Sequence, residues 1–523
     1  MLENWNIKAQ KTLPDSLNGF YLFIGDLDRF RKKKTNTSLD AKVHSKLLKK
    51  LEKSVADLEQ PKWHSLPCAA VELSTLEQDH FCVLLFDQNR SSFDRQSLFA
   101  KHLTGFLETL ESEKHPSLIL EIDDGISPSL QEKILNDFLI LSRAFSWKPK
   151  KISSQSKDSS KKSEKAKGEC NFWVISRIVE SRVTEIKNSA LSLATAINRV
   201  RSLAELPANY LTPKKYLGEI DELLKGYKGV KSTFYDVAQL KKKKAGAFLA
   251  VCQAQGPQCD AGILKLSYKP VKGAKLPLLS LVGKGICFDT GGYNVKTGTH
   301  MFGMHRDMTG SAVALALFLH LIETQWPGPI EAFLALAENH ISPSAYKMNE
   351  VVTASNGVTI EVVHTDAEGR MVLADTLAMA AESKPELLMD FATLTGASVY
   401  TFDGRLAGVF TTKDSIGNTA IAAGRESGER VWPLPLEEDY YRDLESKVAD
   451  IKQCHLKGAG DHIYASCFLS RFLPENQNWL HVDLATEHHD GGLGLISSDT
   501  TGFGVRFARE FLNQYFEIAK AKK

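Results

Sequence analysis

The sequence has little that would assign it to a membrane, a secreted disulfide scaffold or a nucleic-acid-binding class. No run approaches the roughly 18–20 uninterrupted apolar residues of a membrane span. The N-terminus has no basic segment followed by an apolar one, so we expect no signal peptide. The eight cysteines are scattered over 523 residues, which favours reduced thiols in a cytoplasmic protein. A formal net charge of +2 gives no overall attraction to nucleic acid.

Three common catalytic signatures are also missing. The sequence contains no G-x-x-x-x-G-K-[ST], no H-E-x-x-H and no G-x-S-x-G. These motifs build the phosphate loop of P-loop NTPases, the zinc site of zincins and the nucleophile elbow of α/β-hydrolases. Their absence weighs against all three classes.

Alternation of short apolar runs with longer amphipathic segments predicts an α/β fold with mostly parallel sheets. Strands are predicted at 19–27, 80–87, 117–122, 172–179, 276–282, 330–336, 359–363, 387–391 and 479–484. Helices are predicted at 39–58, 96–113, 130–146, 181–206, 311–324, 372–382 and 502–520. We expect an N-terminal α/β domain over 1–180, a connecting helix over 181–209 and a larger α/β domain over 210–523.

The segment 148–168 differs in composition from the rest of the first domain. It consists almost entirely of Lys, Ser, Gln and Glu, so it cannot bury enough apolar surface to order itself. We interpret it as a mobile, solvated loop. The alternative is a nucleic-acid-binding tract over 148–167, the densest basic stretch of the chain.

Two acidic blocks about eighty residues apart carry most of the chemical information. They contain four carboxylates, two lysines and an arginine: Asp289, Asp307, Asp366, Glu368, Lys284, Lys296 and Arg370. Both blocks follow strand-like segments, so we expect the carboxylates to meet at one edge of one sheet. Four crowded carboxylates raise each other's pKa values unless cations compensate them. Two divalent ions would do so, and Mn²⁺, Mg²⁺ and Zn²⁺ all accept carboxylate ligands.

The basic residues of the two blocks fit the same interpretation. A lysine beside two cations is pushed towards the neutral amine, which can itself ligate a metal. A second lysine farther away stays charged and can polarise a carbonyl. Arg370 stays protonated, so it cannot act as a base but can hold a small anion that shuttles a proton. Any single aspartate is more often a loop cap or surface charge, so the prediction depends on the whole set.

At these residues the chain resembles the cytosolic leucyl aminopeptidase family of dimetal peptidases. The matching segments are 282–292 with 365–370, and further 337–339, 392–397, 479–485 and 501–504. The resemblance covers roughly 185–520. It implies a smaller N-terminal α/β domain and a larger C-terminal catalytic domain with a central mixed sheet flanked by helices. His364 departs from the family pattern, which usually has Asn at that position.

The resemblance also implies roles for individual residues. One metal would be held by Lys284, Asp289, Asp307 and Glu368, and the other by Asp289, Asp366 and Glu368. Lys296 would polarise the scissile carbonyl, and Arg370 would bind a bicarbonate that serves as general base. The substrate pocket would be formed by Met301, Thr393, Leu394 and Gly396.

The implied function is that of a metal-dependent aminopeptidase. It would release N-terminal residues from peptides by attack of a dimetal-activated water on the first peptide bond. The resemblance also implies peptide substrates and no membrane partner. The family is typically homohexameric, so we expect a hexamer. Two alternatives stay open: an aminopeptidase fold that doubles as a DNA-binding regulator, and a restricted dipeptidase such as a Cys-Gly hydrolase.

Overall fold

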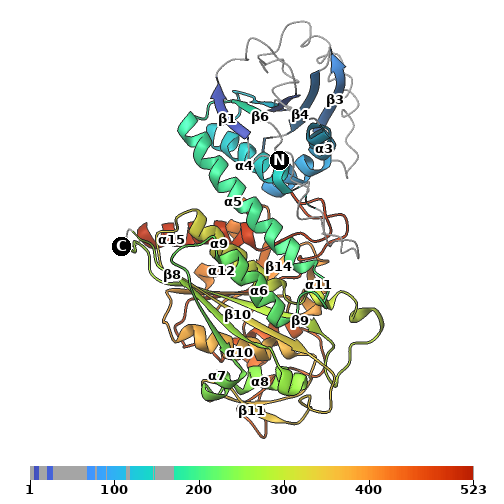
Figure 1. Ribbon diagram of the computed structural model, residues 1–523, viewed down its shortest axis with the longest axis vertical. Coiled ribbons are helices and arrows are strands. Elements are labelled where there is room, and N and C mark those ends of the chain that lie inside the picture. The colour runs from blue at the N-terminus through green and yellow to red at the C-terminus, as the bar shows by residue number, and fades with distance from the viewer. Residues whose placement is uncertain are drawn as a thin grey trace. The chain divides into compact units, whose positions relative to one another are not determined.

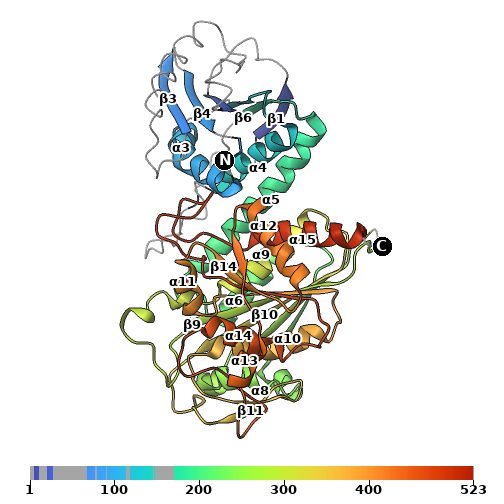
Figure 2. The ribbon, with the colours of Figure 1, turned by 180° about the vertical axis from the view of Figure 1, so that it is seen from behind.

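The chain is drawn from opposite sides in Figures 1 and 2. The computed structural model describes residues 5–10, 20–26, 68–76, 79–86, 88–89, 91–112, 118–144, 147, 170–271 and 273–521. Two compact units are present, Met1–Thr195 with Gly492–Ser498 and Ala196–Gly491 with Asp499–Lys523. They divide between Thr195 and Ala196, within helix α5 (Glu180–Ala204). The helix predicted at 39–58 and the loop predicted at 148–168 lie outside the described residues.

The first unit is built on a six-stranded sheet with the strand order β1-β6-β5-β2-β4-β3. Its strands are β1 (Trp5–Gln10), β2 (Phe20–Asp26), β3 (Cys68–Leu76), β4 (Asp79–Phe86), β5 (Leu118–Ile122) and β6 (Cys170–Ile175). Among the described strands of this sheet only β3 runs antiparallel to its neighbour, so the predicted mostly parallel sheet is confirmed. Helices α3 (Ser92–Ser112) and α4 (Pro128–Ala144) supply connections between its strands, as parallel pairing requires.

The second unit contains an eight-stranded mixed sheet with the order β15-β14-β17-β13-β9-β10-β8-β7. Its strands are β7 (Lys231–Asp236), β8 (Gly262–Tyr268), β9 (Leu279–Asp289), β10 (Ile330–Asn339), β13 (Leu387–Ala392), β14 (Ala407–Phe410), β15 (Val431–Pro433) and β17 (Trp479–Asp483). The four central strands, from β17 to β10, are parallel. Antiparallel strands flank them on both sides, which confirms the mixed sheet that the resemblance implied.

Helices cover both faces of this sheet (Figures 1 and 2). One face carries α9 (Thr309–Glu323), α12 (Asp414–Ser427) and α15 (Val505–Ala521), and the other carries α8 (Gly246–Cys252), α10 (Glu368–Ala381) and α14 (Asp461–Ser470). Strand β9 is therefore buried along nearly its whole length, as expected of a central parallel strand. The unit also contains α6 (Pro213–Leu224), α7 (Val237–Lys242), α11 (Gly396–Phe402) and α13 (Glu438–Asp443). None of the helices in the described part of the chain is long and apolar enough to cross a membrane.

Two glycines let α9 lie directly on the sheet. A Cβ on Gly310 would lie 2.2 Å from the carbonyl oxygen of Phe391, and one on Gly283 would lie 2.4 Å from the Cα of Ser311. Any side chain at either position would push the helix away from β9 and β13. This close packing sets the position of Asp307, which lies two residues before α9 begins.

The second acidic block does not follow a strand of the central sheet, so that part of the prediction is wrong. Strand β12 (Thr359–Glu361) belongs to a separate three-stranded sheet with β11 (Val351–Thr353) and β16 (Ile451–Lys452). With three residues and only Ile360 fully buried, β12 is too short to cross the core. Helix α10 also begins earlier than predicted, at Glu368, which places this carboxylate in its first turn.

Asp375 on α10 joins this helix to two neighbouring segments. Its carboxylate accepts hydrogen bonds from the backbone N–H groups of Phe248 on α8 (2.8 Å) and of Ser355 (2.6 Å). Asp375→Ala should lower the free energy of unfolding by about 2–4 kcal/mol, because it leaves one buried and one half-buried backbone donor without partners. Urea denaturation measures this change. The exposed Asp221→Ala on α6 is the control and should shift stability by less than about 0.5 kcal/mol; equal effects of the two substitutions would contradict the assigned role.

Candidate active site

Lys284 lies at the centre of one half of the site. Its side chain extends from β9 and is only 3% exposed, because β9 is covered on both faces. The ammonium nitrogen Nζ lies 2.8 Å from Oδ1 of Asp307 and 3.0 Å from Oε1 of Glu368. It also donates a 2.9 Å hydrogen bond to the backbone carbonyl of Thr393. One lysine therefore connects β9, the residues before α9, the first turn of α10 and the end of β13.

Lys296 lies at the centre of the other half of the site. Its Nζ lies 2.9 Å from Oδ2 of Asp289 and 2.6 Å from Oδ1 of Asp366. Asp289 is the last residue of β9, and its Oδ1 accepts 2.9 Å hydrogen bonds from the Gly291 N–H and from Nδ2 of Asn339 on β10. All six predicted metal-site and carbonyl-polarising residues thus meet at one place, in two lysine-centred groups.

Hydrogen bonds lock the two acidic blocks together. The backbone N–H of Thr365 donates to the side-chain oxygen of Asn294 (2.8 Å), and its hydroxyl donates to the carbonyl of Gly291 (2.7 Å). The Thr365 carbonyl accepts from Nδ2 of Asn339 (3.1 Å) and from the hydroxyl of Tyr346 (2.6 Å). The sequence did not single out Asn294 or Tyr346, because these supporting residues show no spacing pattern.

The site carries more negative than positive charge. Four carboxylates face two ammonium groups, so two negative charges would be in excess if every group were ionised. Burial, together with the neighbouring carboxylates of Asp289 and Glu368, raises the pKa of Asp366 to about 7. Burial also raises the pKa of Asp307 well above its usual value, and it raises that of Asp289. Such a cluster is poorly compensated by the protein alone.

Among the described residues, two buried oxygens of this cluster have neither a hydrogen-bond nor an ion-pair partner, namely Oδ2 of Asp307 and Oε2 of Glu368. One oxygen each from Asp289, Asp366 and Glu368 also lie within 4.8 Å of one another. A buried carboxylate oxygen without a partner destabilises the folded protein unless a cation or a positively charged group binds it. The excess charge and the oxygen-rich donor set therefore fit divalent cations.

The cluster lies in the wall of a cavity of about 780 Å³. Three of the four predicted substrate-pocket residues line this cavity: Thr393, Leu394 and Gly396. The fourth, Met301, is not among the described lining residues, whereas Met304 is. Asp483 holds the loop that carries them. Its carboxylate accepts from the backbone N–H of Leu394 (3.1 Å) and from the hydroxyl of Thr395 (2.7 Å).

Arg370 lies in the same turn of α10 as Glu368, but its guanidinium already has protein partners. Its Nη2 lies 2.6 Å from Oδ2 of Asp461, and its Nη1 donates to the backbone carbonyl of Gln453 (3.2 Å). It is not among the described residues that line the cavity. Sequence reasoning missed Asp461 and Gln453, which lie more than eighty positions farther along the chain and belong to no recognisable motif.

Gly369 provides a test of how closely Lys284 is packed. A Cβ at Gly369 would lie 2.5 Å from Cε and 2.6 Å from Nζ of Lys284. Gly369→Ala should leave α10 folded, since alanine favours helix, but should displace Lys284. We expect metal affinity to fall by roughly 10–100-fold, as when a support of a metal site is lost. Metal titration measures this loss, and Gly218→Ala, where a Cβ meets nothing within 4 Å, is the control. Equal affinities of the two variants would contradict the packing argument.

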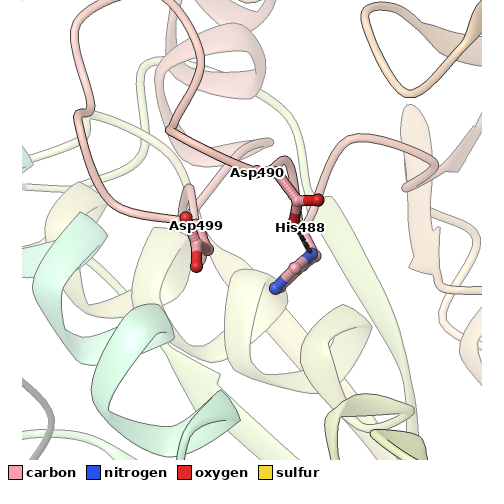
Figure 3. A group of neighbouring side chains, drawn as sticks. All are labelled: His488, Asp490 and Asp499. Atoms are coloured by element: carbon pink, nitrogen blue, oxygen red, sulfur yellow. Dashed lines mark ion pairs between the residues drawn. The ribbon is translucent and has the colours of Figure 1, made fainter.

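A second group of potential metal ligands follows β17 (Figure 3). His488, Asp490 and Asp499 each offer one ligand atom within 4.8 Å of the others, and the ring of His488 points towards Asp490 at 3.9 Å. The Asp490 side chain is 99% exposed. Because solvent already satisfies these carboxylates, we assign no metal to this group.

Comparison with known proteins agrees with this geometry. The family model described as "Cytosol aminopeptidase family, catalytic domain" matches residues 198–508. A probable cytosol aminopeptidase of Synechococcus sp. (strain CC9311) is 36% identical over 317 residues, 60% of this chain and 63% of that protein. Leucine aminopeptidase 1 of Arabidopsis thaliana is 38% identical over 322 residues, 60% of this chain and 60% of that protein. The chain thus aligns with less than two thirds of the length of these relatives.

Solved structures extend the similarity to nearly the whole chain. A mutant of tomato leucine aminopeptidase matches with a TM-score of 0.80 and 26% identity, covering 97% of this chain and 96% of that one. The bottromycin maturation enzyme BotP, solved in complex with Mn, matches with a TM-score of 0.74 and 25% identity, covering 95% and 99%. The matched family segment contains every charged residue of the two acidic blocks. The chain therefore belongs to the cytosol aminopeptidase family.

Proposed function

We propose that this chain is a metal-dependent aminopeptidase that releases N-terminal residues from peptides. The observation that carries the proposal is the cluster of four buried carboxylates and two lysines in the wall of one cavity. The unpaired oxygens of Asp307 and Glu368 add to it. Membership of the cytosol aminopeptidase family supports the same activity.

The proposed ligands are the four carboxylates with Lys284. One ion would be held by Lys284, Asp289, Asp307 and Glu368, and the other by Asp289, Asp366 and Glu368. Divalent ions there would supply the Lewis acidity that activates a water and stabilises the negative oxygen formed at the carbonyl. BotP was solved with Mn, so Mn²⁺ is the first ion to test, followed by Zn²⁺ and Mg²⁺.

Lys296 is the proposed electrophile. Its side chain is 15% exposed and lines the cavity, so a substrate can reach its ammonium. Although burial opposes the charge, the carboxylates of Asp289, Glu368 and Asp366 raise the pKa of Lys296, which keeps it protonated. A fixed positive charge beside a carbonyl oxygen stabilises the charge that develops there during attack.

The cavity supports action on chain ends. A volume of about 780 Å³ is typical of sites for small ligands and admits a few residues of an extended peptide, but no folded chain. The loop from Thr393 to Gly396, held by Asp483, would contact the first side chain. We further propose a cytoplasmic location and a homohexamer, on the basis of the family resemblance; light scattering tests the latter.

The test is hydrolysis of a panel of aminoacyl amides and short peptides, Cys-Gly included, by metal-loaded protein whose metal content is measured. We expect release of free N-terminal residues, no cleavage of N-acetylated peptides, and loss of activity after chelation. Cleavage confined to Cys-Gly would identify a restricted dipeptidase. Absence of hydrolysis across the panel, with two equivalents of metal bound, would refute the proposal.

A further inference from the structure

Asp461 supplies the buried guanidinium of Arg370 with an anion from the protein itself. The Arg370 side chain is 2% exposed and that of Asp461 is 27% exposed. Their 2.6 Å separation is that of a charge-assisted hydrogen bond. The charge of the guanidinium is therefore already paired with a carboxylate of the protein.

The backbone around Asp461 favours a negative charge at this position. Asp461 is the first residue of α14, directly after Gly460, which adopts a left-handed conformation (φ 69°) at the N-cap. Unpaired N–H groups at a helix N-terminus stabilise nearby anions. The Asp461 carboxylate thus lies where the field of α14 and the charge of Arg370 act together.

The Arg370 partners also hold the segment that carries the metal-site carboxylates. Gln453, whose carbonyl accepts from Arg370, donates through Nε2 to the carbonyl of Ala367 (3.0 Å). Its side-chain oxygen accepts from the N–H groups of Val363 and His364, each at 3.1 Å. These contacts hold the backbone on both sides of Asp366 and of Glu368.

We propose that Asp461 replaces the free bicarbonate that the resemblance assigns to Arg370, and that it positions Arg370 and the 363–370 segment without an added anion. This inference rests on the proposed function. A carboxylate and a bicarbonate present the same planar pair of oxygens to a guanidinium. A second anion on this guanidinium would face the charge of Asp461 and be repelled. The enzyme is therefore independent of bicarbonate.

Two substitutions separate the charge of Asp461 from the space that it fills. Asp461→Asn removes the charge but keeps a side chain of the same size, whereas Asp461→Ala removes both and opens room for an ion. We expect both variants to lose kcat by up to about 10²-fold through misplacement of the site. Sodium bicarbonate should restore Asp461→Ala only, and KM should change little. The assays use metal-loaded protein that is desalted into CO₂-stripped buffer. Desalting removes free metal, which would otherwise precipitate when bicarbonate is added.

The melting temperature gives a readout that does not depend on turnover. At ten times its dissociation constant, bicarbonate should raise the Tm of Asp461→Ala by roughly 1–2 °C. It should not raise the Tm of the wild type or of Asp461→Asn. The exposed Asp403→Asn, which breaks the surface pair with Arg405, is the control and should behave as the wild type in both assays.

The outcomes are distinct. A saturable Tm increase of the wild type with bicarbonate, lost in Arg370→Met, would overturn the proposal even if Asp461→Ala failed to fold. So would full activity of Asp461→Ala in CO₂-stripped buffer. If the wild type hydrolysed no peptide, the proposed function would fail, while the Tm comparison would still decide whether Asp461 excludes bicarbonate.

Discussion

Glu368→Ala should abolish peptide hydrolysis while the protein stays folded. The Glu368 side chain is 2% exposed, lies 3.0 Å from Nζ of Lys284 through Oε1, and has an Oε2 without a partner among the described residues. It is also one of three carboxylates whose oxygens lie within 4.8 Å of one another. Without it, both proposed ions lose a ligand, and no neighbouring carboxylate can substitute because the surrounding core is closely packed.

The stability of this variant should separate a metal-site role from a structural one. In metal-free protein Glu368 forms a buried ion pair with Lys284; although burial opposes its charge, Lys284 and Lys296 lower the pKa of Glu368, so its removal costs this pair. We therefore expect a Tm below that of metal-free wild type in a protein that still folds, and loss of the stabilisation that added Mn²⁺ gives the wild type. The control at the opposite end of the same helix is Glu382→Ala, which breaks only an exposed pair with Lys243. Normal turnover by metal-loaded Glu368→Ala would refute the ligand assignment.

Lys296→Ala should lower kcat by about 10²–10³-fold, as for loss of one donor to a developing oxyanion. Metal content should remain that of the wild type, since Lys296 is not a proposed ligand. Its ammonium touches Asp289 and Asp366 and lines the cavity, so it is positioned both to balance charge and to meet a carbonyl.

A charge-conserving substitution sharpens this test. Lys296→Arg keeps the positive charge and should retain more activity than Lys296→Ala, though less than the wild type, because a planar guanidinium does not reproduce the geometry of an ammonium. The exposed Lys347→Ala, which breaks a surface pair with Glu350, is the control. Steady-state kinetics decide the matter: a rise in KM with kcat unchanged would assign Lys296 to substrate binding alone.

The central elements of the fold were predictable because their residues form long, uniform patterns. Strands β9, β10 and β13 are mostly apolar and almost entirely buried, and α9 combines length with an apolar composition. Edge strands such as β7, with an exposed and mixed pattern, gave no comparable signal. Short strands depend on their partners, so the separate sheet containing β12 was not predictable from three residues.

The charged residues of the site were predictable for a different reason. They lie in two short segments whose composition is improbable for a surface loop. Their supports are not local: Asn294 contacts Thr365 across 71 positions, and Asp461 contacts Arg370 across 91. Such pairs are created by the tertiary fold, and a single sequence shows no periodicity that connects them.

The central claim is that two divalent ions bind among Asp289, Asp307, Asp366 and Glu368. The most direct measurement is a crystal structure of Mn²⁺-loaded protein with anomalous data collected at the manganese edge. Our account predicts two anomalous peaks within ligand distance of these carboxylates. A map with no peak there, from protein fully loaded with metal, would contradict it.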